Sequence, residues 1–302
     1  MKKSLLLVQL MNRYYFIINP ASKKGSVKTK KEIITFFDTK EAEAVVDFWT
    51  RDKIVYFMVK EAVEKNFDTI VACGGDGTIM EVGKALIGRN VNMGIIPLGS
   101  GNGIARHFSI PSNIQEALEI LLTQKTQKMD VGKANEYYFF GNIGFGIEVD
   151  FIQAYQRKKR HGLLGYGLAY WNALFRFNYS TFELIEQDQS ALLTPYTLMI
   201  SNTNEQGYGR TLTPQAKTND GKLNLVGLPK QNWIKLSLFM LQIGLFKQPL
   251  QKKNLLEKEI TQIQIKGKNL PFPIQIDGEY IELDEDTISI SVLKGGLSII
   301  TG

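Results

Sequence analysis

Three glycine-rich segments in the first half of the sequence have the composition of phosphate-binding loops. They are residues 19–26 (NPASKKGS), 74–78 (GGDGT) and 99–103 (GSGNG). Glycine lets backbone N–H groups approach phosphate oxygens closely, and a helix that begins there adds a favourable dipole. Any one of these segments could be only a tight turn between a strand and a helix. Together at one edge of a sheet, the three predict a cradle for a polyphosphate.

Known phosphate fingerprints do not describe these loops. The Walker pattern requires four residues before its Gly-Lys pair, whereas five separate Gly77 from Gly83, and Ala85 stands where Ser or Thr is needed. The dinucleotide pattern G-x-G-x-x-G fails at Ile104, which occupies the position of its third glycine. The sequence also lacks protein-kinase signatures. The phosphates must therefore be bound by another kind of glycine loop.

Carboxylates at two places could take part in phosphoryl transfer, which needs a metal on the phosphates and an acceptor for the hydroxyl proton. Asp76 lies between glycines, where it can face phosphate-bound Mg²⁺ or cap the helix that begins before Thr78. Asp277 and Glu279 form a second acidic pair, but Asp277-Gly278 taken alone is better interpreted as an ordinary hairpin turn.

The elements that position the three loops alternate between strands and helices. The predicted strands are 14–19, 44–49, 69–73 and 93–97, and the predicted helices are 27–37, 52–65, 78–87 and 113–122. Such alternation indicates a doubly wound parallel sheet covered on both faces. In these sheets, ligands bind at the carboxyl ends of the strands, which is where the glycine segments lie.

Strand patterns dominate from about Met129, and we predict a β-sandwich there. The predicted strands are 137–142, 182–186, 196–201, 223–228, 260–265, 274–276 and 287–293, interrupted by helices at about 147–171 and 233–246. The domain boundary is placed near Lys128.

Composition limits the chemistry further. The chain has 302 residues, 44% of them apolar, and a formal net charge of +6, which suits a globular protein. One cysteine, Cys73, and two histidines, His107 and His161, exclude an intramolecular disulfide, a Cys-based metal site and a histidine-rich metal centre. We therefore expect a hard cation held by carboxylates. The single thiol is consistent with a reducing cytoplasm.

We expect no signal peptide, because the N-terminal apolar run at residues 5–8 is too short for its core. The longest later apolar stretch, 233–246, is too short for a bilayer span, which needs about 20 apolar residues. We expect a cytoplasmic protein that is soluble or rests on the inner face of the membrane. The apolar residues of 233–246 either fill the core or form a lipid-chain pocket or membrane-touching face. The basic cluster 157–161 is either solvated or attracts phosphate. It lacks nucleic-acid motifs, so no nucleic-acid partner is expected.

The segment GGDGT after a buried strand resembles the diacylglycerol kinase catalytic domain family, which includes sphingosine and ceramide kinases. NAD kinases and phosphofructokinases share the wider superfamily. Five further motifs follow the family's order and extend the resemblance over nearly the whole chain. They are 19–20 (NP), 97–106 (PLGSGNGIAR), 129–132 (MDVG), 142–146 (NIGFG) and 277–279 (DGE).

The resemblance implies an ATP-binding α/β domain at residues 1–128, a lipid-binding β-sandwich at 129–295, and a chain end, 296–302, that returns to the first domain. It implies that Asp277 is the general base, with Glu279 in a water-mediated Mg²⁺ network. Asp76 is a second Mg²⁺ ligand and a competing base. The residues expected to bind ATP are Asn19, Pro20, Ser22, Lys23, Thr50, Gly74, Gly75, Gly77, Thr78, Gly99, Ser100, Gly101 and Asn102. Thr50 is equally well read as a helix cap.

Departures from the family pattern concern the lipid. Bacterial diacylglycerol kinases usually have an aspartate where this chain has Gly103, and in this respect the loop is more similar to sphingosine kinases. Glu148 and Asp150 lie where sphingosine kinases carry acidic residues that contact the lipid head group; otherwise they begin a solvated helix. Asp220 lies in a segment that resembles a structural Mg²⁺ loop of bacterial members, or forms a plain turn.

The leading hypothesis is an ATP-dependent lipid kinase that phosphorylates the hydroxyl of diacylglycerol or of a long-chain base such as sphinganine. The alternatives are an NAD kinase-like enzyme, and a nucleotide- or lipid-binding sensor without catalysis. We expect a membrane surface to present the lipid. The sequence leaves open a homodimer and does not decide between the lipids.

Overall fold

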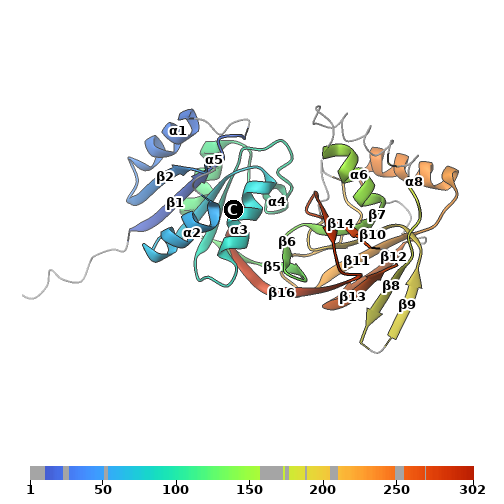
Figure 1. The fold of residues 1–302 in the computed structure, drawn as a ribbon. Helices are drawn as coiled ribbons and strands as arrows, with labels where there is room; N and C mark the ends of the chain where they lie inside the picture. The colour runs from blue at the N-terminus through green and yellow to red at the C-terminus, as the bar shows by residue number, and fades with distance from the viewer. Residues whose placement is uncertain are drawn as a thin grey trace, which may run out of the picture. The chain divides into compact units, whose positions relative to one another are not determined.

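The computed structural model describes residues 11–22, 27–50, 54–156, 173, 177–187, 189–204, 210–248, 255–268 and 270–302. The chain divides into two compact units. The first unit comprises residues 1–129 and 296–302, and the second unit comprises residues 130–295. Each unit has its own core and is described by itself (Figure 1).

A parallel sheet forms the centre of the first unit, with strand order β2-β1-β3-β4-β16. Its strands are β1 (Asn12–Ile18), β2 (Ala42–Phe48), β3 (Thr69–Gly74), β4 (Asn92–Pro97) and the end of β16 (Thr287–Ile300). Its helices are α1 (Val27–Phe37), α2 (Val55–Glu64), α3 (Asp76–Leu86), α4 (Gly103–His107) and α5 (Ile114–Thr123). α1 and α5 contact each other on one face, and α2 and α3 contact each other on the opposite face.

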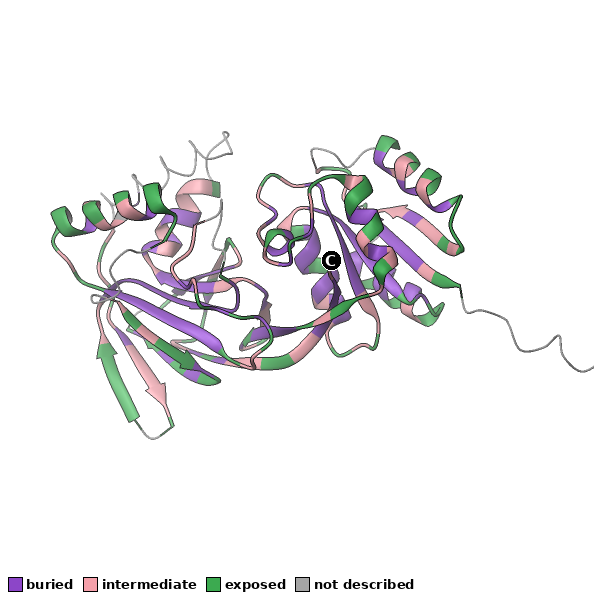
Figure 2. Ribbon diagram, turned by 180° about the vertical axis from the view of Figure 1, so that it is seen from behind, coloured by how far each residue is buried: buried purple, intermediate pink, exposed green. Residues whose placement is uncertain are grey.

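Burial on both faces explains the composition of the central strands, because neither face meets water. All six residues of β3 are buried, as are the last five residues of β1 (purple in Figure 2). The end of β16 is similar: Leu297, Ile299 and Ile300 are buried, and Ile299 pairs with Met93 of β4. The chain end therefore completes the sheet of the first unit.

Two antiparallel layers enclose the core of the second unit. One sheet has the order β12-β11-β10-β7-β14-β15, and the other layer comprises β16, β13, β8 and β9, with β5 paired to β16 and β6 paired to β5. The strands are β5 (Thr126–Ala134), β6 (Tyr137–Phe139), β7 (Asn142–Gly146), β8 (Phe182–Glu186), β9 (Gln189–Leu193), β10 (Pro195–Ser201), β11 (Leu223–Pro229), β12 (Leu256–Ile260), β13 (Gln262–Gly267), β14 (Phe272–Ile276) and β15 (Glu279–Leu283).

Alternate residues of these strands point into the sandwich, as the two-residue period of a strand requires. Phe145, Phe182 and Phe272 meet there with ring centroids 5.8 to 6.0 Å apart. A second apolar cluster lies on the other face of the β10–β11 sheet, where α6 (Ile147–Gln156) and α8 (Trp233–Phe246) pack. The fold class predicted from the sequence, an α/β domain followed by a β-sandwich, is confirmed.

The structure differs from the sequence prediction for one strand, and it describes only part of one predicted helix. Residues 137–142 were expected to form one strand, but β6 ends at Phe139 and β7 begins at Asn142. The chain leaves the sheet at Phe140 and Gly141 because their N–H groups bind a side chain, as described below. The helix expected over about 147–171 is described only as far as Gln156, and residues 157–172 lie outside the described part.

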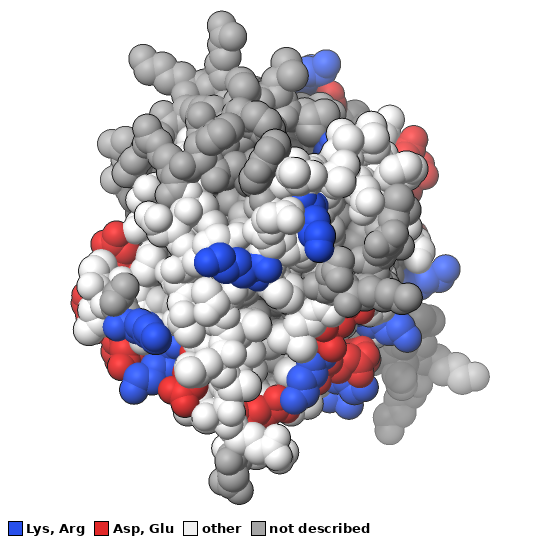
Figure 3. All heavy atoms as spheres, turned by 90° about the vertical axis from the view of Figure 1, so that its right-hand side faces the viewer, with Lys and Arg blue, Asp and Glu red and all other residues white. Residues whose placement is uncertain are grey.

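One side of the second unit is largely uncharged. Figure 3 shows this side, on which most described residues are uncharged. A few Lys or Arg side chains lie in its middle, and the acidic side chains lie toward its rim. Within the described residues, no helix is both long and apolar enough to cross a membrane.

The burial of the chain end predicts its contribution to stability. Ile299→Ala should lower the free energy of unfolding by about 2–5 kcal/mol, because it leaves a cavity beside β4. Leu293→Ala, on the same strand but exposed, is the matched control and should cost much less. Urea unfolding monitored by circular dichroism measures both; equal costs would contradict the placement of Ile299.

Candidate functional site

Three loops meet at the carboxyl ends of β1, β3 and β4, as the sequence pattern predicted. The backbones of the second and third loops are in contact: a Cβ on Gly99 would lie 2.5 Å from the Cα of Gly75. The Leu98 N–H also donates to the Gly74 carbonyl over 2.8 Å. Only glycine fits such a backbone approach, so these glycines fix the distance between the two loops.

Asn19 joins the first loop to the second. Its Nδ2 donates to the Thr78 hydroxyl over 3.0 Å, and its Oδ1 accepts the Ala21 N–H over 2.9 Å. The Ser22 hydroxyl donates to the Asn19 carbonyl. Gly74 must be glycine here, because a Cβ would lie 2.3 Å from the Thr78 hydroxyl oxygen. Asn19, Ser22 and Thr78, all predicted to bind ATP, thus also hold the loops together.

Asn102 closes the third loop on itself. Its Oδ1 accepts the Gly99 N–H and its Nδ2 donates to the Gly99 carbonyl, both over 3.0 Å. Asn102 is buried and left-handed, with φ 53°, a conformation that asparagine tolerates. The Arg106 guanidinium donates to the Gly101 carbonyl. The backbone of the loop is therefore fixed before any ligand arrives.

Asp76 is the carboxylate of this cradle. It is the first residue of α3, whose N-cap is Gly75, so the alternative that Asp76 caps the helix was wrong. Its Oδ1 accepts the Ile104 N–H over 3.2 Å, and its Oδ2 lies beside Gly101. The side chain is half-buried and faces the third loop. A hard cation fits this oxygen donor.

The cradle offers few carboxylates for a metal. Within the described ranges, no group of three or more His, Cys, Asp or Glu side chains could hold an ion. A cation at Asp76 would thus take its remaining ligands from phosphate oxygens and water, the usual arrangement for Mg²⁺.

The other residues predicted to contact the nucleotide differ in their exposure to solvent. Gly77 is exposed, and nothing lies within 4 Å of the point where its Cβ would stand, which leaves room for a ligand. Pro20, Thr50 and Ser100 are exposed beside the loops or after β2. Lys23 lies outside the described residues.

Asp277 organises a turn in the second unit. Its carboxylate accepts three consecutive backbone N–H groups, those of Phe140, Gly141 and Asn142, each over 2.8 Å. Asp277 and Gly278 have φ of 49° and 87° and connect β14 to β15, so the sequence prediction of a hairpin turn is correct as local structure. The carboxylate clamps the 140–142 bend, a role that the sequence did not suggest.

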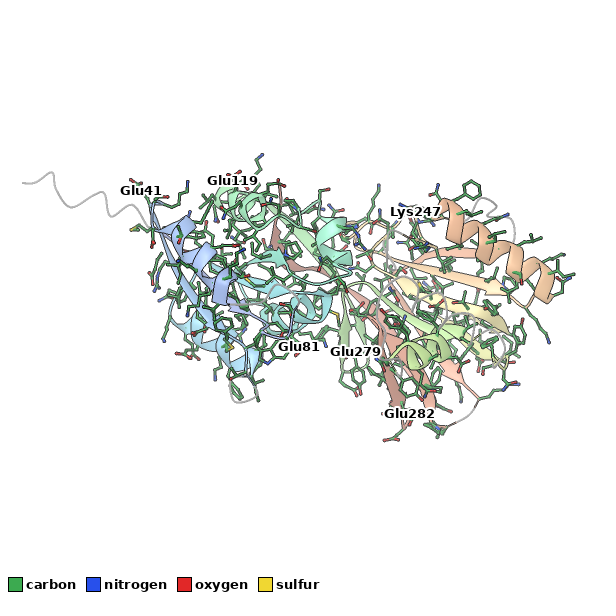
Figure 4. All side chains as sticks on the ribbon, turned by 90° about the horizontal axis from the view of Figure 1, so that it is seen from above. Glu41, Glu81, Glu119, Lys247, Glu279 and Glu282 are labelled. Atoms are coloured by element: carbon green, nitrogen blue, oxygen red, sulfur yellow. The ribbon has the colours of Figure 1, made fainter. Side chains whose placement is uncertain are left out.

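Glu279 follows this turn as an exposed residue at the start of β15, labelled in Figure 4. Beneath the turn, buried Gln275 donates to Asn142 Oδ1 over 2.6 Å and accepts the Gly278 N–H over 2.9 Å. Gln275 was missed in the sequence, where its only signal is a polar residue inside the apolar β14.

Glu148 begins α6 beside the same network. The buried Thr197 hydroxyl donates to its Oε1 over 3.0 Å, and Gly144 packs against its side chain. Desolvation raises the pKa of Glu148 from 4.5 to about 7, against the smaller lowering effect of Thr197. Desolvation also raises the pKa of Asp150. Glu148 is therefore half-buried and hydrogen-bonded, which disfavours a fully solvated helix start at this residue.

Asp220 makes a turn, with its Oδ1 accepting the Lys222 N–H over 3.0 Å. The buried acid nearby is Asp130, whose two carboxylate oxygens accept the N–H groups of Gly221 and Gly295 over 2.6 and 2.7 Å. Asp130 thus fixes the loop that carries Asp220. It was quoted in a sequence motif, but no role was assigned to it.

The profile of the diacylglycerol kinase catalytic domain matches residues 13–134. The profile of the YegS C-terminal NAD kinase beta sandwich-like domain matches residues 141–301. The chain belongs to the diacylglycerol kinase catalytic domain family. The family resemblance inferred from the motifs is confirmed, and membership implies ATP and, typically, a divalent metal.

Relatives support the same assignment along most of the chain. A diacylglycerol kinase from Staphylococcus aureus is 27% identical over 287 residues, which are 90% of this chain and 87% of the relative. A diacylglycerol kinase from Bacillus subtilis is 27% identical over 277 residues, 89% of this chain and 90% of the relative.

Solved structures show the fold. A diacylglycerol kinase from Bacillus anthracis superposes with a TM-score of 0.72 and 18% identity, covering 96% of this chain and 97% of that one. Yeast NADH kinase is more distant, with a TM-score of 0.56 and 12% identity, covering 97% of this chain and 84% of that one.

The raised pKa of Glu148 predicts a pH-dependent effect on stability. An acid whose pKa rises on folding costs stability as pH increases from its unfolded pKa, 4.5, to its folded pKa, about 7. Glu148→Gln removes that cost, so the Tm of the variant relative to wild type should rise between pH 5 and pH 8. Thermal melts measure this, with Glu136→Gln, at an exposed position, as control. A difference that does not change with pH would contradict the burial of the Glu148 charge.

Proposed function

We propose that this protein transfers the γ-phosphate of ATP to the hydroxyl group of a lipid. The observation that carries the proposal is the cradle of two fixed glycine loops, to which Asn19 ties the start of the first loop. One carboxylate, Asp76, faces into this cradle, in a chain of the diacylglycerol kinase family. Backbone N–H groups of the loops and the N-terminus of α3 would hold the phosphates. Lys23 of the first loop is proposed to add a positive charge.

In this proposal, the divalent metal is Mg²⁺, held by Asp76, with Glu279 in its water network. Bound Mg²⁺ neutralises charge that develops on the transferring phosphate. The carboxylate oxygens of Asp76 fit a hard cation. A separate structural Mg²⁺ at Asp220 is a further proposal; the Asp220 carboxylate retains one oxygen beyond its turn bond.

The general base is proposed to be Asp277 or Asp76. The two carboxylates differ in how many N–H groups donate hydrogen bonds to them. Three N–H donors already occupy the Asp277 carboxylate, which leaves fewer of its lone pairs for a substrate hydroxyl. A single described N–H donates to Asp76. The geometry thus favours Asp76 as proton acceptor, with Asp277 as the residue that shapes the 140–142 bend.

The two aspartates should respond differently to the same substitution. Asp76→Asn should reduce phosphate transfer about a hundredfold or more and leave Tm unchanged, because the amide oxygen can still accept the Ile104 N–H. Asp277→Asn should also lower Tm, because an amide group cannot accept all three N–H bonds and leaves one unsatisfied. Transfer of labelled γ-phosphate and thermal melts measure both effects.

The result can also reject the proposal. Transfer by Asp76→Asn within threefold of wild type would remove Asp76 from the mechanism, since that is less than about 1 kcal/mol of barrier. Phosphorylation of NAD in place of a lipid would indicate the NAD kinase alternative. ATP binding without transfer to any lipid would indicate a sensor.

We further propose that the lipid is a long-chain amino alcohol such as sphinganine, with diacylglycerol as the competing substrate. Glu148 and Asp150 are desolvated acids on α6, and a protonated amine would stabilise their charge. A charge-assisted hydrogen bond of this kind contributes roughly 1.5–3 kcal/mol. Neutral diacylglycerol offers no such partner.

Accordingly, sphinganine should be phosphorylated at least as well as diacylglycerol. Glu148→Gln should lower kcat/KM for sphinganine about tenfold or more and leave that for diacylglycerol unchanged. Glu136→Gln provides the matched control at an exposed position of the same unit. The amino alcohol proposal would be rejected if diacylglycerol were turned over well, sphinganine were not, and Glu148→Gln had no effect. The substrate would then be diacylglycerol.

A further inference from the structure

Helix α8 presents a row of large apolar side chains to solvent. Ile234, Leu238, Leu241 and Leu245 are 53%, 56%, 57% and 68% exposed. Their spacing of four, three and four residues places them on one face of the helix. We propose that this row, the α8 stripe, docks the protein on the surface of an anionic lipid bilayer. The inference rests on the proposed lipid kinase function.

The stripe cannot be explained as part of the core. The opposite face of α8 already packs on the second unit through buried Leu236 and Ile243 and partly buried Phe239. A helix that is apolar all round is normally enclosed on every side. Here one face is enclosed and the other is exposed, as the green outer surface of α8 shows (Figure 2). Exposed apolar surface of this extent usually marks an interaction site.

The sequence segment that contains the stripe carries charges of one sign. No Asp or Glu occurs between Gly221 and Leu256, whereas this segment carries six lysines. Lys235 lies on α8 and Lys230 precedes the helix. Lys247, labelled in Figure 4, directly follows it. Lysines beside exposed leucines complement a surface with an apolar interior and negative head groups.

A hollow at the start of α8 provides space for a head group. It has a volume of about 480 Å³ and is lined by Pro229, Lys230, Gln231, Asn232, Lys235, Leu255 and Leu256. The Lys230 ammonium lies 4.8 Å from the centre of the Tyr179 ring, which holds this lysine at the hollow. The apolar stripe and the basic hollow are therefore adjacent. This arrangement matches a lipid leaflet, in which the apolar tails lie next to the phosphates.

A second copy of the chain would complement this surface less well. A symmetric dimer through the stripe would bring the same lysines of both copies together, and like charges at an interface oppose association. Anionic lipid neutralises them instead. Docking there would also hold the enzyme at the membrane that contains its proposed substrate.

Vesicle flotation of the full chain, without ATP, tests the proposal. Wild type should bind vesicles of equal phosphatidylglycerol and phosphatidylcholine and should bind pure phosphatidylcholine at least fivefold less. The triple variant Leu238→Gln, Leu241→Gln, Leu245→Gln should bind the anionic vesicles at least tenfold less. Leu192→Gln, at a leucine 71% exposed on β9, is the matched control and should bind like wild type.

A second variant tests the charges separately. Lys230→Gln with Lys235→Gln should lower binding to anionic vesicles at least fivefold, whereas Lys133→Gln, an exposed lysine of β5, should not. This pair decides the question if the triple variant does not fold. The proposal would be overturned if either variant folded and bound anionic vesicles as well as wild type, or if wild type bound both kinds of vesicle equally. It would also be overturned if a variant changed its oligomeric state while its vesicle binding stayed the same.

Activity separates this proposal from the kinase proposal. Transfer to a short-chain, water-soluble lipid should be unchanged in the α8 variants, because they affect docking alone. Loss of vesicle binding with this transfer intact supports docking. Wild-type transfer without vesicle binding overturns docking only, and vesicle binding without any transfer overturns the kinase function only.

Discussion

The close approach of two backbones, at Gly75 and Gly99, is the constraint on which the candidate nucleotide site depends. The contact brings the turns after β3 and β4 within van der Waals distance, and any Cβ on Gly99 would separate them. Asn102 fixes one turn internally and Asn19 ties the other to the first loop. The N–H groups that would bind phosphate are thus pre-positioned by glycine sterics and asparagine hydrogen bonds, which reduces the reorganisation needed when charge develops on the phosphate.

The second unit uses carboxylates where the first uses glycines. Asp277 gathers three consecutive N–H groups and Asp130 joins two distant glycines, Gly221 and Gly295. Hydrogen bonds to a charged acceptor are stronger than neutral ones, so an acid can hold irregular backbone that no strand partner satisfies. Acidic residues in a sequence motif can therefore be structural anchors rather than metal ligands, and hydrogen-bond partners distinguish the two roles.

Glu148 illustrates a third use of an acid. It lies against a buried hydroxyl with its charge poorly solvated, which raises its pKa to about 7. Such an acid gains most from a cationic partner. α8 presents the complementary case, in which apolar side chains lie in water without a partner. Both features carry unfavourable solvation, which the proposed amine would relieve at Glu148 and the proposed bilayer at the α8 stripe.

The sequence alone determined the α/β domain, the β-sandwich and the position of the three glycine loops, because period, glycine placement and strand ends are local properties. It also pointed to Asp76. It could not show that Asp277 binds residues 140–142, that Gln275 links the same turn, or that Glu148 is desolvated, since these depend on contacts more than a hundred residues apart or on burial. The apolar pattern of α8 likewise predicted a helix, but only packing decided which face is buried and which meets water.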